Sequence, residues 1–292
     1  MKQSFLSRLH TNGVYYIIGT LLLVIGVPLY QSLVLLPQGY SDALASAEGG
    51  AFAPYLFWIG NHPGVFLGYR ALSIAGFTAL FSLPFTLFRI IVAQEILGGG
   101  DTEPVAEGTG EDDHPQQEDS LESSESRREP QETDTEEENN TFSWRGKGFA
   151  VLAAWAGLLA FILYVLGTLA STLYLWVVSN GFTEHAAMPG GFSTISGATT
   201  IVTYTIGEGL LAIACLFFGA MIVRSGLKLW PGIWVAFGYT ALVVAALLSV
   251  SAVAVASAPI EGKAALTTPA ILLFALWALW FGVILVRLKP EP

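Results

Sequence analysis

Residues 149–178 read FAVLAAWAGLLAFILYVLGTLASTLYLWVV, and this stretch contains no Asp, Glu, Lys or Arg. Crossing the hydrocarbon core of a bilayer, about 30 Å thick, takes roughly 20 apolar residues in a helix. The stretch exceeds that length and lacks the alternating pattern of a membrane-spanning strand. It therefore predicts a transmembrane helix, in which every backbone polar group is satisfied within the segment.

Five further stretches of the same kind occur along the 292-residue chain, which is 53% hydrophobic and only 12% charged. Together they predict an all-α fold, a polytopic bundle of six transmembrane helices over residues 14–36, 64–97, 149–178, 198–223, 232–257 and 268–286. Pro84 lacks an N–H donor and crowds the preceding turn, so a kink is expected there. In the fourth helix we expect close backbone approach to its neighbours at three small residues, Gly207, Gly209 and Gly219.

Composition divides the chain into three parts. Residues 1–97 hold the first two helices and an outer loop, 37–63, and residues 142–292 hold the other four helices. Between them, residues 98–141 form an acidic linker, because 16 of the 23 Asp and Glu residues lie from Asp101 to Glu138. With almost no aliphatic side chains, this segment cannot bury enough apolar area to offset its ordering entropy, so we expect it to be disordered.

The distribution of basic residues predicts the orientation, because cytoplasmic loops carry an excess of Lys and Arg. With the N-terminus inside, only Arg70 and Lys263 fall on the outer side. The six helices then place both termini and the acidic linker in the cytoplasm, with the protein in the plasma membrane. The cytoplasmic set is Lys2, Arg8, Arg89, Arg127, Arg128, Arg145, Lys147, Arg224, Lys228, Arg287 and Lys289.

A competing signal follows the first apolar stretch, where Ala45-Ser46-Ala47 has the small-x-small form of a signal-peptidase site. Cleavage after Ala47 would leave five helices. The apolar stretch over residues 14–36 is longer than the core of a signal peptide, which favours a retained first helix.

The most informative single residue is Glu208, near the middle of the fourth predicted helix. A carboxylate at mid-bilayer costs a few kcal/mol, so it should face the bundle interior and be paired or protonated. Helical spacing places Thr200 and Tyr204 on the same face. Arg70, near the outer end of the second helix, is the candidate partner. These four residues predict a polar pocket opening toward the outer leaflet.

Each of these residues also has a purely structural interpretation. Glu208 could stay neutral and hydrogen-bond a neighbouring helix to fix packing. Arg70 could extend its charged end to the lipid headgroups. The residue types alone leave both interpretations open.

Several function classes lack the motifs they require. The chain has no HExxH zinc-protease motif and no GxxxxGK[ST] phosphate-binding loop. Ser196 is followed by no later histidine of the kind that a rhomboid-like protease needs. His62 and His185, with Glu184 nearby, supply too few ligands for a metal site. We therefore expect no enzyme activity, no cofactor and no metal.

The residue composition also limits the possible binding partners. The 13 Lys and Arg residues are scattered rather than clustered, which argues against nucleic acid. A single cysteine, Cys215, excludes an intramolecular disulfide. The lipid bilayer is the expected environment, and the acidic linker is suited to a basic protein partner.

Residues 210–239 read LLAIACLFFGAMIVRSGLKLWPGIWVAFGY, an aliphatic helix ending at Arg224-Ser225-Gly226 and a short turn through Trp230-Pro231-Gly232 into the next helix. This pattern resembles a broad group of uncharacterised prokaryotic six-helix membrane proteins, known as a domain of unknown function. The resemblance covers about a third of the chain and implies six helices with no assigned activity.

Two functional hypotheses follow. The first is a membrane protein that binds or translocates a small solute, a proton or an ion through a pocket near Glu208. The alternative is a non-catalytic structural or regulatory membrane protein that acts through its acidic cytoplasmic linker. Substrate, partner and oligomeric state are left open by the sequence.

Overall fold

Six long apolar helical runs make up the computed structural model, which describes residues 3–98, 134–183, 186–257 and 267–288. These residues are helical apart from short turns and contain no strand. The runs long and apolar enough to cross a membrane are Ser7–Gln38, Pro63–Gln94, Gly148–Ser179, Phe192–Leu229, Gly232–Ser257 and Thr268–Arg287. They are numbered here as spans 1 to 6. The predicted all-α architecture with six such helices is confirmed.

The spans are built from the following helical elements. Span 1 consists of α1 (Gln3–Leu21), the π-helical η1 (Leu22–Gly26), α2 (Val27–Tyr30), the π-helical η2 (Gln31–Leu35) and the 3-10 turn η3 (Leu36–Gln38). Span 2 comprises α5 (Pro63–Ala79) and α6 (Leu83–Gly98), and span 3 is the membrane part of α7 (Asp134–Ser179). Span 4 joins α8 (Phe192–Thr200), the π-helical η4 (Ile201–Ile206) and α9 (Gly207–Leu229). Spans 5 and 6 are α10 (Gly232–Ser257) and α11 (Thr268–Arg287).

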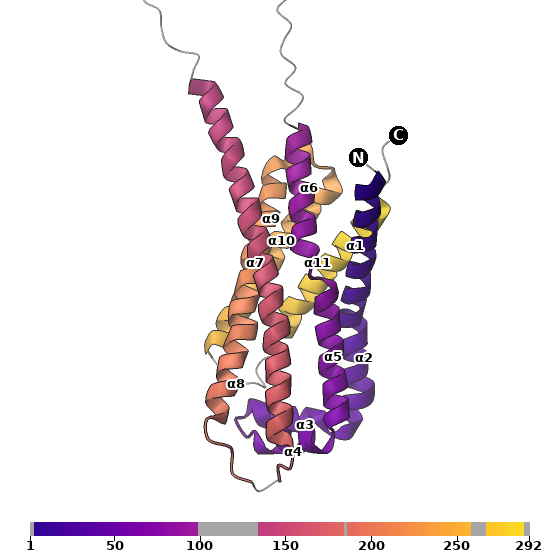
Figure 1. Ribbon diagram of the computed structural model, residues 1–292, viewed down its shortest axis with the longest axis vertical. Helices are drawn as coiled ribbons and strands as arrows, with labels where there is room; N and C mark the ends of the chain where they lie inside the picture. The colour runs from indigo at the N-terminus through magenta and orange to yellow at the C-terminus, as the bar shows by residue number, and fades with distance from the viewer. Residues whose placement is uncertain (1–2, 99–133, 184–185, 258–266, 289–292) are drawn as a thin grey trace, which may run out of the picture.

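The two ends of the bundle differ. The start of α1, the end of α11, the end of α6 and the start of α7 all lie at one end, the terminal end (Figure 1). Two short helices, α3 (Tyr40–Glu48) and α4 (Ala53–Asn61), lie across the opposite end, the capped end (Figure 1). Both chain ends therefore share one side of any membrane that the bundle crosses, and their assignment to the cytoplasm stays a prediction.

Two segments are more helical than the sequence suggested. The outer loop 37–63 contains α3 and α4. Helix α7 begins at Asp134, inside the segment predicted to be a disordered linker. Glu is a good helix former, and residues 134–141 include three Glu residues. Residues 99–133 of the predicted linker lie outside the described residues.

The kink expected at Pro84 is a complete break in span 2. The backbone carbonyl of Leu80 accepts from the N–H of Leu83 at 2.9 Å, in a turn that separates α5 from α6. Pro84 cannot donate to that carbonyl, because its nitrogen carries no hydrogen. The break is held from the side by Tyr16 of α1, whose hydroxyl lies 2.9 Å from Ser82 Oγ and 2.7 Å from Thr86 Oγ1.

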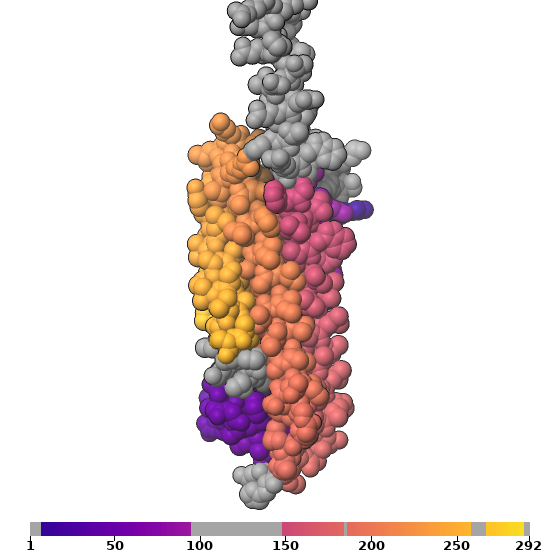
Figure 2. Space-filling view, turned by 90° about the vertical axis from the view of Figure 1, so that its left-hand side faces the viewer, coloured from indigo at the N-terminus to yellow at the C-terminus, as the bar shows by residue number. Residues whose placement is uncertain are grey.

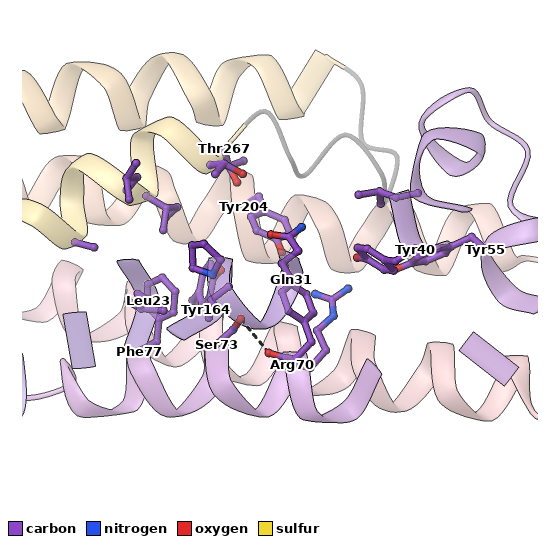
Figure 3. A pocket seen from close by; sticks show the side chains of 18 residues that line it. Leu23, Gln31, Tyr40, Tyr55, Arg70, Ser73, Phe77, Tyr164, Tyr204 and Thr267 are labelled. Carbon is purple, nitrogen blue, oxygen red and sulfur yellow. Dashed lines mark hydrogen bonds between the residues drawn. The ribbon is translucent and has the colours of Figure 1, made fainter. Parts of the chain in front are cut away.

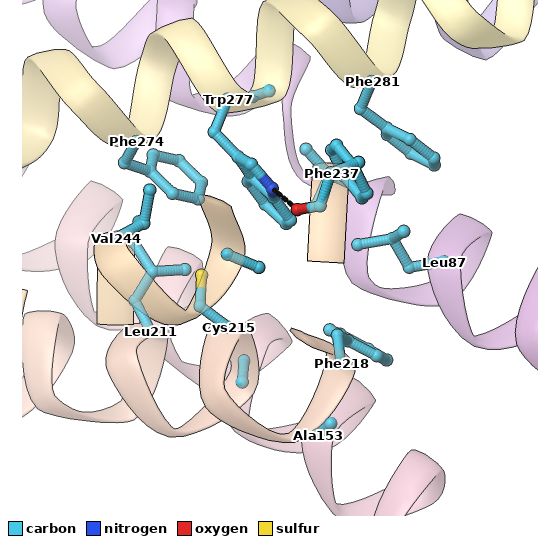
Figure 4. Packing of buried hydrophobic residues seen from close by; sticks show 14 of the residues in the cluster. Leu87, Ala153, Leu211, Cys215, Phe218, Phe237, Val244, Phe274, Trp277 and Phe281 are labelled. Atoms are coloured by element: carbon cyan, nitrogen blue, oxygen red, sulfur yellow. Dashed lines mark hydrogen bonds between the residues drawn. The ribbon is translucent and has the colours of Figure 1, made fainter. Parts of the chain in front are cut away.

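The main hydrophobic core fills the terminal half of the bundle. Phe237 of α10 stacks on Trp277 of α11, with ring centroids 4.7 Å apart, and the indole N–H donates to the Phe237 carbonyl at 3.2 Å (Figure 4). Phe274 and Phe281 extend this packing along α11 (Figure 4). A smaller cluster at the capped end packs α3 and α4 against the ends of the long helices. A cavity lies between the two clusters.

Glycine allows the closest helix contacts. A Cβ added at Gly219 would lie 2.8 Å from the backbone carbonyl of Gly238, as expected from the sequence, whereas one added at Gly209 would meet nothing within 4 Å. On α11, a Cβ added at Gly282 would lie 3.0 Å from the carbonyl of Gly13 on α1. Small residues at these crossings let backbones approach without side chains between them.

We expect Gly282→Ala to destabilise the protein and Gly209→Ala to leave it as stable or slightly more stable. Both substitutions gain helix propensity, but only the first forces α1 and α11 apart, and overpacking costs about 1–3 kcal/mol. Thermal unfolding of the detergent-purified variants measures the difference. Equal unfolding temperatures for the two variants would show that α11 can shift away from α1 without loss.

Candidate functional site

A cavity of about 250 Å³ lies between the capped end and the main core (Figure 3). It is bounded by span 1, α5, α7, η4 and the first turns of α11, with α3 and α4 contributing at the capped end. For scale, an apolar cavity of about 150 Å³ is large enough to bind benzene. The space therefore suits an organic molecule of several more heavy atoms.

Arg70 gives the cavity its charge. Of the described residues that line it, Arg70 alone carries a formal charge, and this side chain is only 9% exposed. Its Cζ lies 5.3 Å from the centroid of the Phe66 ring, a cation–π contact that helps to hold the guanidinium away from water. The guanidinium carries five N–H donors in a fixed plane, an arrangement suited to carboxylate and phosphate oxygens.

Tyrosine is the commonest polar residue in the wall around Arg70. Five of them line the cavity: Tyr40, Tyr55, Tyr69, Tyr164 and Tyr204. The Tyr164 and Tyr204 rings meet edge to face with centroids 5.8 Å apart. Each phenol offers a flat apolar face and a hydroxyl that can donate or accept, which suits a ligand with both apolar and polar parts.

Tyr40 lies outside the membrane spans and belongs to the wall at the capped end. Burial raises the pKa of Tyr40 well above its ordinary value, and the neighbouring Tyr55 and Tyr69 raise it further. The positive charge of Arg70 lowers this pKa only in part. Tyr40 therefore stays a neutral hydroxyl at physiological pH and can donate a hydrogen bond.

The helices that line the cavity are locally irregular. The three π-helical segments of the described chain each place a residue in the cavity wall: Leu23 in η1, Gln31 in η2 and Tyr204 in η4. A π-turn widens the helix and redirects its side chains, and such turns occur often at functional sites. The irregularity of spans 1 and 4 is thus concentrated around this cavity.

Comparisons of this chain with family models, with curated proteins and with solved structures found no match. The resemblance of residues 210–239 to six-helix membrane proteins stays a prediction. The function has to be inferred from the site itself.

The sequence grouped Glu208, Thr200, Tyr204 and Arg70, and the structure divides them. Arg70 and Tyr204 both line the main cavity. Thr200 lies with them at a narrow space between α5, α7 and span 4. Glu208 instead borders a separate void of about 10 Å³, one helical turn farther toward the terminal end. The main cavity is therefore lined by Arg70 and Tyr204 but not by Glu208.

Glu208 is nevertheless close to the cavity. Its void shares three wall residues with the cavity, namely Phe77, Tyr164 and Ile271. The side chain is 1% exposed, and neither carboxyl oxygen makes a hydrogen bond with a described residue, although the hydroxyls of Ser251 and Thr267 lie beside it. Thr267 precedes the first turn of α11, where the helix dipole favours an acidic group.

Several lining residues carried no functional signal in the sequence. Tyr40, Tyr55 and Tyr69 come from three different helices, and the aromatic stretch around Tyr55 suggests only an interfacial segment. Gln31 is the one amide side chain within residues 14–36, and this polar residue was the available signal.

His62 packs against its own helix. This ring stacks on Trp58 with centroids 5.0 Å apart, and its Nδ1 lies 3.1 Å from the Trp58 carbonyl oxygen. His185 and Glu184 lie outside the described residues. Within the described ranges, no group of three or more His, Cys, Asp or Glu residues could hold a metal ion.

Proposed function

We propose that this chain is a plasma-membrane protein, with its terminal end in the cytoplasm, that binds a small organic anion in the Arg70 cavity. The observation that carries the proposal is a buried guanidinium beside tyrosine and threonine hydroxyls in a cavity large enough for an organic ligand. A carboxylate or phosphate would pair with the guanidinium in a bidentate, charge-assisted contact. Such contacts are strong where water is excluded.

Two further features favour an anion over a cation or a neutral molecule. The first turn of α11 faces the cavity through Thr267, Thr268 and Ile271, and the partial positive charge of a helix N-terminus adds to that of Arg70. The tyrosine and threonine hydroxyls can all donate to anionic oxygens. The proposal is one of binding without chemical change to the ligand.

This proposal keeps the solute-binding hypothesis drawn from the sequence and moves its centre from Glu208 to Arg70. The alternative, a regulatory protein acting through its acidic linker, depends on residues that lie largely outside the described ranges. No described contact favours it.

The proposal is tested with ligands that share a ring and differ in charge: benzoate, phenyl phosphate, benzamide and benzylamine. In thermal unfolding of the detergent-purified protein, we expect the two anions to raise the unfolding temperature. A ligand present at about 100 times its Kd stabilises a folded protein by about 2.7 kcal/mol. If benzamide or benzylamine stabilises the protein as much as benzoate does, the positive charge of the site does not select the ligand.

A further inference from the structure

The cavity is closed toward both ends of the bundle. At the capped end, the buried Tyr40 packs against Trp58 with ring centroids 4.9 Å apart and against Tyr55 at 6.2 Å. Toward the terminal end, Phe77 and Tyr164 lie against each other with centroids 3.9 Å apart. A ligand that arrives along the bundle axis from either end would have to separate these ring contacts.

The cavity is open at its side. Only three of the described lining residues are exposed, and they lie on α2 and α11: Pro28, Thr268 and Leu272. Leu272 is 40% exposed although its helix is part of a membrane span. Helix α11 packs along α1 and reaches η1. The opening therefore lies between α2 and α11, on the perimeter of the bundle.

The depth of this opening follows from the length of α11. Its 20 residues span about 30 Å at 1.5 Å per residue, which matches the hydrocarbon thickness of a bilayer. With Arg287 at one boundary of the hydrocarbon layer, Thr268 lies at the other, and Leu272 lies about 6 Å inside. Helix α11 also stops short of α3 and α4 along the long axis (Figure 2). The opening thus spans the level where lipid headgroups meet acyl chains.

We infer that the anion is the headgroup of a single-chain membrane amphiphile that enters sideways from the lipid. This inference rests on the proposed function. The acidic headgroup, a carboxylate or a phosphate, reaches Arg70 and the tyrosine hydroxyls. The alkyl chain passes out between Pro28 and Leu272 and stays in the bilayer or along the apolar walls formed by Leu23, Val27 and Ile271. Amphiphiles already reside at this depth, so the ligand need not cross the capped end.

The first arm of the test compares chain lengths. Butanoate and dodecanoate, and butyl and dodecyl phosphate, are titrated against the protein in lipid nanodiscs, with the Arg70→Met variant as the reference for non-specific partitioning. Each methylene buried is worth about fourfold in affinity. We expect the Arg70-dependent affinity to rise at least tenfold from the four-carbon to the twelve-carbon ligand. The two headgroups distinguish a fatty acid from a phospholipid-like source.

The second arm of the test uses a variant in which the opening between α2 and α11 is narrower. Leu272→Trp places a larger side chain at the opening and should weaken dodecyl ligands at least tenfold more than butyl ligands. Leu276→Trp is the matched control, because Leu276 lies one turn farther along α11, is 43% exposed and does not line the cavity. This variant should bind both ligand lengths as the unaltered protein does.

The measurements distinguish failure of the amphiphile, failure of its route and failure of the organic-anion site. If short anions bind with full Arg70 dependence and a longer chain adds nothing, the amphiphile is excluded and the organic-anion site stands. If Leu272→Trp and Leu276→Trp reduce dodecyl binding equally, the route between α2 and α11 is excluded. If no anion of either length depends on Arg70, the proposed function itself fails.

Discussion

Replacing Arg70 with methionine is expected to lower the affinity for an organic anion at least about thirtyfold while the protein stays folded. Removing one partner of a buried charge pair costs about 2–5 kcal/mol in binding, because the anion is left without its counter-charge. Methionine has a similar unbranched stem and can keep the apolar contact with Phe66. Arg70 also contacts neighbouring groups, so the unfolding temperature of the unliganded variant is measured beside its affinity to separate lost binding from lost folding.

Binding is measured by calorimetry or by the shift in unfolding temperature with benzoate and phenyl phosphate. Arg89→Met is the matched control, since Arg89 is exposed on α6 and does not line the cavity. Arg70→Lys keeps the charge but loses the bidentate guanidinium, so an intermediate loss is expected. Undiminished binding by Arg70→Met would remove the central support for an anion site.

Replacing Glu208 with lysine is expected to destabilise the protein by about 3 kcal/mol or more, and replacing it with glutamine by less than about 1 kcal/mol. The void beside Glu208 is only about 10 Å³, and its walls are mostly apolar, including Phe161 and Leu211. Lysine would bring a longer side chain and a positive charge toward the N-terminus of α11, where the dipole disfavours it. Glutamine keeps the shape and can hydrogen-bond Ser251 or Thr267.

Thermal unfolding and the monodisperse fraction after size-exclusion chromatography report these effects. The control is the same change at an exposed site, Glu48→Lys on α3, which should alter stability by no more than about 0.5 kcal/mol. If Glu208→Lys is as stable as Glu48→Lys, the surroundings of Glu208 are wetter than their burial indicates. Anion binding by Glu208→Gln then separates its two interpretations: unchanged affinity supports a packing role, and altered affinity supports a functional one.

The break in span 2 shows how a single residue can fix a local feature in advance. Pro84 cannot donate a backbone hydrogen bond whatever surrounds it, so an interruption near that position follows from covalent structure alone. The glycines show the opposite case. Gly209 and Gly219 look alike in the sequence, yet only Gly219 meets a neighbouring backbone, because the direction that each residue faces depends on which helix packs there.

The site could be predicted only in part. Glu208 and Arg70 stand out because charged residues within apolar stretches are costly and therefore rare. Helical spacing grouped Thr200, Tyr204 and Glu208 on one face of a helix, on the assumption of regular turns. The π-helical segment over Ile201–Ile206 and the crossing of α7 leave Tyr204 in the main cavity and Glu208 in a separate void.

By itself, the sequence determined that this protein has six helices able to span a membrane, because hydrocarbon thickness and backbone hydrogen bonding set the length and polarity that each helix needs. Those constraints act within one segment at a time. The cavity is different, since its walls come from segments as far apart as Leu23, Tyr55 and Thr267, and no local rule relates them. Only the tertiary structure decided that Arg70 and five tyrosines line one cavity, because packing between helices brings those side chains to one place.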